Sequence, residues 1–131
     1  MQFDEFINRV QEQSGVDTRE QAVGLTRAVL ETLGERLDRK VRNGVEAQLP
    51  NELKEYLLAR SENPDKYNLT EFYNRVGARA DLTYQDAARR TWQVFSVVRD
   101  AISGGEIEDI LADLPSEYRE LFEETLPTRW R

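Results

Sequence analysis

The chain has 131 residues, with 18 basic and 25 acidic side chains, a formal net charge of −7, and neither cysteine nor histidine. This length corresponds to one domain or two very small ones. Without cysteine and histidine there is no disulfide, no thiolate metal ligand, no cysteine nucleophile and no histidine general base. We therefore expect no cofactor, no metal and no enzymatic activity. Because negative charge repels phosphate backbones and anionic lipids, we also expect no nucleic-acid or membrane partner.

The N-terminus and the apolar segments indicate neither export nor membrane insertion. No apolar run approaches the ~20 residues that span a bilayer. The first five residues, MQFDE, carry acid where a signal peptide has basic residues and then an apolar stretch. We expect a cytoplasmic protein.

The first half of the chain predicts four helices. The first has an apolar stripe at helical spacing, formed by Phe3, Phe6, Ile7 and Val10. The second is longer, begins at the N-cap Thr18, and carries an apolar stripe as far as Leu37. A weak third helix follows, where Asn43-Gly44 is also compatible with a β-hairpin. Pro50 then opens a fourth helix.

The second half repeats this pattern, with N-caps predicted at Asn68 and Thr83. The segment FINRV at 6–10 returns as FYNRV at 72–76, an offset of 66 residues, and from Thr18 and Thr83 onward the offset is 65 residues. A clear third helix follows the loop at 103–105, and Pro115 opens the fourth. The matches stay in order over almost the whole length, which indicates an internal duplication.

These patterns predict an all-α fold, in which two tandem four-helix repeats pack as one compact pseudo-two-fold helical domain over residues 1–131. Repeat 1 covers about residues 1–62 and repeat 2 about residues 67–126, joined by a short turn at 61–66. Each repeat alone would be marginal in size, so the two are expected to share one core. The tail at 127–131 lies past the last helix, where it is loose, docked on the body, or bound to a partner.

The fourth helix of each half begins with a similar motif, QLPNEL at 48–53 and DLPSEY at 113–118. With the duplicated Phe-x-x-Arg-Val opening and the long capped helix that ends near Leu37, this pattern resembles the bacterial family catalogued as domain of unknown function 2267. The resemblance covers essentially the whole chain. It implies a small helical protein, and it carries no activity and no catalytic residue over to this sequence.

The two long helices differ where the rest of the halves agree. Gly24, Arg27 and Gly34 of the first correspond to Arg89, Trp92 and Arg99 of the second. The two glycines indicate either a close approach by another group or neutral drift on a solvated face. Arginines beside tryptophan are typical of interface anchors, although Trp92 is also suited to fill a groove between the halves. The predicted interaction surface consists of Arg89, Trp92, Arg99, Arg129 and Trp130.

The only candidates for metal ligands or acid–base catalysts are the side chains of an acidic cluster. It consists of Glu106, Glu108, Asp109 and Asp113. Oxygen ligands suit Ca²⁺ or Mg²⁺, but acid near a helix N-terminus is favourable without any metal.

Three functions follow as hypotheses. The first is a non-catalytic protein–protein interaction or self-assembly module. The second is a small-molecule binding protein with an apolar cleft between the repeats, lined by Leu25, Tyr73, Trp92 or Phe95. The third is an enzyme that works through carboxylates, which requires an acid buried in a cleft with a raised pKa.

Overall fold

The computed structural model describes residues 1–58 and 63–131, and these residues form helices and connecting segments without any strand. In chain order the elements are α1 (Phe3–Ser14), α2 (Arg19–Arg36), α3 (Arg39–Gln48), η1 (Asn51–Leu53), α4 (Lys54–Leu57), α5 (Leu69–Ala80), α6 (Tyr84–Ala101), α7 (Gly104–Asp113), η2 (Ser116–Phe122) and η3 (Thr128–Trp130).

The hairpin alternative at Asn43-Gly44 is wrong, because both residues lie inside α3. The predicted fourth helix of the second half is a 3₁₀ helix, η2. The predicted turn at 61–66 lies partly outside the described residues.

The helices begin at the predicted caps. The Thr18 hydroxyl accepts the Gln21 N–H at 3.1 Å, and Gln21 Oε1 accepts the Thr18 N–H at 3.0 Å, which forms a complete capping box. Asn68 caps α5 and Thr83 caps α6 through the backbone N–H of the third helical residue. These bonds satisfy donors that a helix start otherwise leaves unpaired.

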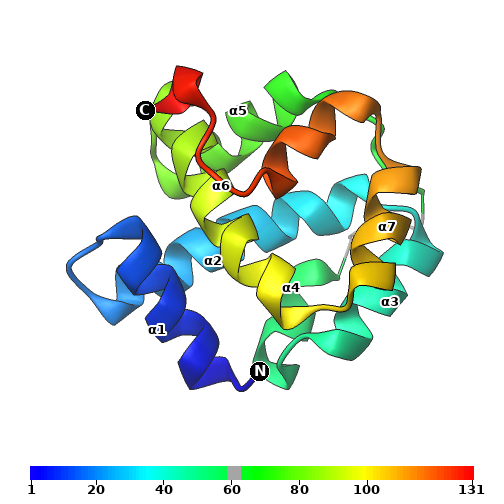
Figure 1. The fold of residues 1–131 in the computed structure, drawn as a ribbon, viewed down its shortest axis with the longest axis horizontal. Helices are drawn as coiled ribbons and strands as arrows, with labels where there is room; N and C mark the ends of the chain where they lie inside the picture. Colours follow the sequence, from blue (N-terminus) through cyan, green and yellow to red (C-terminus); the bar gives the residue numbers. More distant parts are fainter. Residues whose placement is uncertain (59–62) are drawn as a thin grey trace.

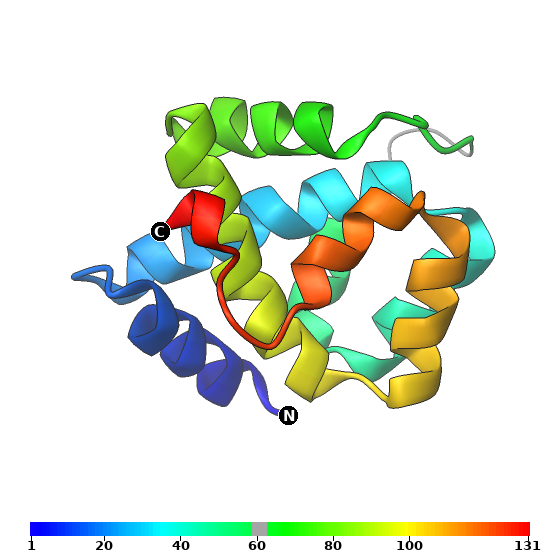
Figure 2. The same cartoon turned by 45° about the horizontal axis from the view of Figure 1, so that its top comes forward.

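The packing interleaves the two halves of the chain. Helix α1 packs against α2 and α6, and α5 packs against α6 and α2. The long helices α2 and α6 also contact each other near the middle of the molecule (Figure 1). Helix α4 covers α2, η2 covers α6, and α3 lies beside α7 at one end, as both views show (Figure 2).

One hydrophobic core runs through both halves. Its fully buried side chains include Phe6 and Leu33 from the first half and Phe72, Phe95 and Tyr118 from the second. The Phe72 ring meets Tyr118 and Phe95 edge to face, at centroid distances of 5.8 and 6.3 Å, a favoured aromatic geometry. The chain is therefore an all-α domain. None of the helices in the described ranges is both long and apolar enough to cross a bilayer.

Glycine serves two different purposes in α2. A Cβ placed on Gly34 would lie 2.3 Å from the carbonyl oxygen of Leu57, so the backbone of α4 can approach α2 only because this residue has no side chain. A Cβ on Gly24 would meet nothing within 4 Å. The close approach suggested by the two glycines is confirmed at Gly34 and wrong at Gly24.

Candidate functional site

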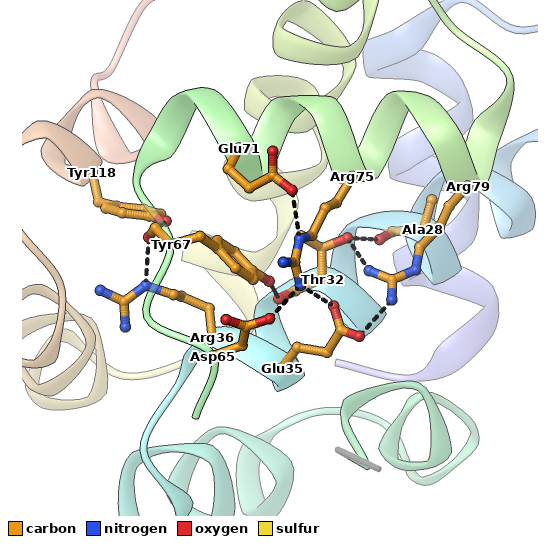
Figure 3. Close-up of polar contacts among 10 residues, drawn as sticks. All are labelled: Ala28, Thr32, Glu35, Arg36, Asp65, Tyr67, Glu71, Arg75, Arg79 and Tyr118. Atoms are coloured by element: carbon orange, nitrogen blue, oxygen red, sulfur yellow. Dashed lines mark hydrogen bonds and ion pairs between the residues drawn. The ribbon is translucent and has the colours of Figure 1, made fainter. Parts of the chain in front are cut away.

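A polar network joins α2 to α5, and its charged groups form ion pairs with one another (Figure 3). The guanidinium of Arg75 contacts Glu71 at 2.9 Å and Asp65 at 2.8 Å, and lies 4.0 Å from the centroid of the Tyr67 ring. Arg79 contacts Glu35 at 2.7 Å. Each charge thus has an opposite charge beside it, as expected of an ion-pair network that holds two helices in a fixed relative position.

Tyr67 anchors the inner end of this network. Its hydroxyl donates to the Thr32 carbonyl at 2.5 Å, and its own carbonyl accepts from Arg36 Nε at 2.8 Å and from the Tyr118 hydroxyl at 2.7 Å. Burial raises the pKa of Tyr67, and burial raises the pKa of Tyr118 to about 12. Both phenols therefore stay protonated near neutral pH and act as hydrogen-bond donors that fix the segment before α5.

The predicted interaction residues converge on the C-terminal segment of their own chain. Trp92 Nε1 and Arg99 Nη1 both donate to the Glu123 carbonyl at 3.1 Å. Arg89 Nε donates to the Trp130 carbonyl at 2.8 Å. Trp92 is 9% exposed and Trp130 is 7% exposed. These side chains bind the last residues of the chain to α6.

The tail at 127–131 is docked on the body. The Trp130 ring packs edge to face on Tyr73 and Tyr84, at centroid distances of 5.4 and 5.7 Å, and its Nε1 donates to Glu120 at 2.8 Å. Arg129 pairs with Glu120 and lies over the Trp130 ring. At this end of the molecule Arg129, whose side chain is 60% exposed, and Tyr84, which is 39% exposed, lie at the surface.

The sequence predicts an apolar cleft between the halves lined by Leu25, Tyr73, Trp92 or Phe95, and the structure places one of these residues, Leu25, in a pocket. Tyr73 and Phe95 are fully buried in the core, and Trp92 holds the C-terminal segment. Leu25 alone among the four lines one of the surface pockets described here, which lies between α2 and the α5–α6 corner.

A different pocket, which we call the acidic pocket, lies between α3 and α7. It has a volume of about 540 Å³ and is lined by Asp38, Lys40, Val41, Gly44, Glu106, Asp109, Ala112 and Asp113. Glu106, Asp109 and Asp113 of the predicted acidic cluster thus line one cavity, while Glu108 lies outside it and is exposed. Among the ion pairs of the described residues, none includes any of the four acids that line this pocket.

Glu106 is the buried member of the acidic pocket. Glu106 is 8% exposed. Its Oε1 is buried and has no hydrogen-bond partner. A Cβ on Gly44 would lie 2.2 Å from that oxygen, so the carboxyl group reaches its position only because α3 has a glycine there. Burial and the neighbouring charge of Asp109 raise the pKa of Glu106.

Asp38 and Asp113 form a second pair of acids that line the pocket. Asp113 accepts the backbone N–H of Asp38 at 2.9 Å. Burial and the Asp38 side chain raise the pKa of Asp113. The sequence cluster did not include Asp38 and Gly44, because they precede it by more than 60 residues and reach it only through the contact of α3 with α7.

The spacing of these carboxyl groups argues against a metal centre. In residues 1–58 and 63–131, no group of three or more acidic side chains is arranged to hold a metal ion. The acids line the pocket together with the aliphatic side chains Val41 and Ala112.

Replacing Glu106 by glutamine is expected to raise the free energy of unfolding by about 1 kcal/mol at neutral pH, because the buried charge disappears. Since the folded pKa of Glu106 is raised, the folded wild type binds more protons than the unfolded chain between the two pKa values. Its stability therefore falls as pH rises through that window. Urea unfolding at about pH 4 and about pH 7 should show the benefit of glutamine only at the higher pH. An equal benefit at both values would contradict this explanation.

The sequence profile of a family described as "Uncharacterized conserved protein (DUF2267)" matches residues 3–121. This range contains α1 to α7 and nearly all of η2, and so includes every residue of the acidic pocket. No curated protein matches the chain. This description names no activity.

Proposed function

We infer that this chain, which belongs to the DUF2267 family, is a non-catalytic interaction module that takes a basic side chain of a partner protein into the acidic pocket between α3 and α7. The observation that carries the proposal is the carboxyl group of Glu106, buried in that pocket with an unpaired oxygen. A buried charge without a partner is costly, and a cationic group in the pocket that Glu106 lines would lower this cost by charge attraction.

Charge and shape support a lysine or arginine side chain as the occupant. Asp109 and Asp113 add negative potential around Glu106, and the pocket walls include the aliphatic Val41 and Ala112. A long basic side chain presents an aliphatic stem to such walls and a charged head to the carboxylates. Complementary charge also accelerates the encounter between two proteins.

A carboxylate-based enzyme is the second candidate, favoured by the raised pKa of Glu106 and of Asp113 in one cavity. Binding is the stronger proposal because it needs only the negative charge of these carboxyl groups, whereas an enzyme also needs proton transfer to a positioned substrate. Lys40 is the only basic residue in the described lining of the acidic pocket, so the charge of this lining is negative.

The test is a calorimetric titration of the full chain with an acetylated tetralysine amide. We expect saturable binding to the wild type, and a loss of about tenfold in affinity in Glu106→Gln, because that variant keeps the shape but removes the charge. The matched control is Glu108→Gln, which removes the same charge from the same helix outside the pocket. It should change the affinity by less than about twofold.

Equal weakening by the two variants would show attraction to overall charge and would overturn the proposal, as would the absence of binding to the wild type. The peptide recovered after incubation should have an unchanged mass. Cleavage or modification of it would favour the enzyme instead. If the partner is a second copy of the chain, sedimentation equilibrium will show a dimer that Glu106→Gln dissociates.

We also propose that two tandem four-helix repeats, related by a pseudo-two-fold axis, make up the domain. The paired helices have equal lengths: α1 and α5 have 12 residues each, α2 and α6 have 18, and α3 and α7 have 10. The contacts between the repeats are also equivalent. Helix α1 of the first repeat packs on α6 of the second, and α5 of the second packs on α2 of the first. The acidic pocket would then lie where the third helices of the two repeats meet.

A further inference from the structure

A second pocket lies where α2 meets the corner between α5 and α6. It has a volume of about 420 Å³ and is lined by Val16, Gln21, Gly24, Leu25, Arg79, Ala80, Leu82 and Arg90. This volume is within the range of about 300–1,000 Å³ that is typical of small-molecule sites. We call it the Gly24 pocket, and it shares no residue with the acidic pocket.

Gly24 lines this pocket without a side chain. The residue lies inside α2, where glycine costs about 1 kcal/mol relative to alanine, yet a Cβ there would meet nothing within 4 Å. The α2 backbone therefore does not need glycine for packing. A larger side chain at this position would occupy the space between Leu25 and the α5–α6 corner.

The charge of the Gly24 pocket is opposite to that of the chain. Although the chain has a net charge of −7, the described lining includes Arg79 and Arg90 and no acidic residue. Arg79 is already paired with Glu35. Arg90 donates to the Ser14 carbonyl and to the Gln93 side-chain oxygen, which are both neutral, and none of the ion pairs in the described part of the chain includes it.

We propose that the Gly24 pocket binds a small-molecule carboxylate with an unbranched aliphatic body. The carboxylate pairs with Arg90, because a guanidinium recognises a carboxylate through paired N–H donors. The aliphatic body contacts Val16, Leu25 and Leu82, and leaves water as it does so. This site goes beyond the proposed docking of a basic side chain, which involves other residues and the opposite charge.

The test is a titration of the intact protein with decanoate below its micelle concentration, followed by two-dimensional NMR. We expect saturable shifts of the backbone amides around Gly24 and Leu82. Decylammonium has the same body and the opposite charge, and acetate has the charge without the body, so neither should saturate these shifts. The variant Arg90→Gln should bind decanoate about tenfold more weakly, because it loses a charge-assisted hydrogen bond.

Gly24→Leu fills the pocket and should abolish the saturable shifts. Gly104→Leu is the matched control, because Gly104 is also helical and also has open space around its Cβ position. It should bind decanoate like the wild type. Unchanged binding in Gly24→Leu, or equal saturation by decylammonium, would overturn the proposal. If circular dichroism shows that Gly24→Leu does not fold, Arg90→Gln decides the question.

Discussion

Gly34→Ala is expected to lower the free energy of unfolding by about 3 kcal/mol, the upper part of the usual range for overpacking. The added Cβ would lie 2.3 Å from the Leu57 oxygen, 2.8 Å from its carbonyl carbon and 2.9 Å from its Cα. These are backbone atoms, so no flexible side chain can move aside, and α4 itself must shift away from α2. Urea denaturation followed by circular dichroism measures the effect.

The matched control is the same substitution ten residues earlier in the same helix. Gly24→Ala adds a methyl group where nothing lies within 4 Å, so it should raise the free energy of unfolding by about 0.5–1 kcal/mol through helix propensity alone. Opposite signs for the two variants are the expected result. A stabilising Gly34→Ala would mean that α4 does not approach α2 as closely as described.

Trp130→Ala is expected to lower the free energy of unfolding by about 3 kcal/mol, the lower end of the range for a buried tryptophan. The indole is 7% exposed, contacts Tyr73 and Tyr84, and donates to Glu120. Its removal leaves two tyrosine rings uncovered and releases the end of the chain from α6. Thermal and urea unfolding measure the loss.

Trp130→Phe is the control for this prediction. Phenylalanine keeps an aromatic ring against Tyr73 and Tyr84 but lacks the N–H that donates to Glu120. It should therefore cost less, about 1 kcal/mol from the hydrogen bond plus the smaller ring. If Trp130→Ala left stability unchanged, the tail would be loose in solution, and Trp130 would be available as the partner anchor that its sequence context suggests.

The positions of the helices were predictable because the forces that set them are local. The N-caps Thr18, Asn68 and Thr83 bond to a backbone N–H only three residues away, so the sequence contains both partners side by side. The buried faces were equally readable, since Phe6, Ile7 and Val10 occupy one helical stripe and are fully buried. The absence of cysteine and histidine likewise needs no structure.

The candidate site was predictable only in part. The acids of α7 were visible as a cluster, but the features that make Glu106 special are its burial and the glycine opposite it, Gly44. Gly44 belongs to α3, and its contact with α7 joins segments far apart in the chain. Residue spacing along one helix carries no information about which other helix will cover it.

The two tryptophans, and the two glycines of α2, also show the difference between what the sequence predicts and what tertiary packing decides. Composition predicts that tryptophan beside arginine binds a protein surface, and the structure shows that this surface belongs to the chain itself. Trp92 donates to the Glu123 carbonyl in the C-terminal segment, and Trp130 packs on Tyr73 and Tyr84 of α5 and α6. Gly24 and Gly34 are identical residues in one helix, and the sequence by itself determines only that each weakens that helix. Tertiary structure decides that α4 lies against Gly34 and that Gly24 faces an open pocket, because close packing depends on what another part of the chain brings to each position.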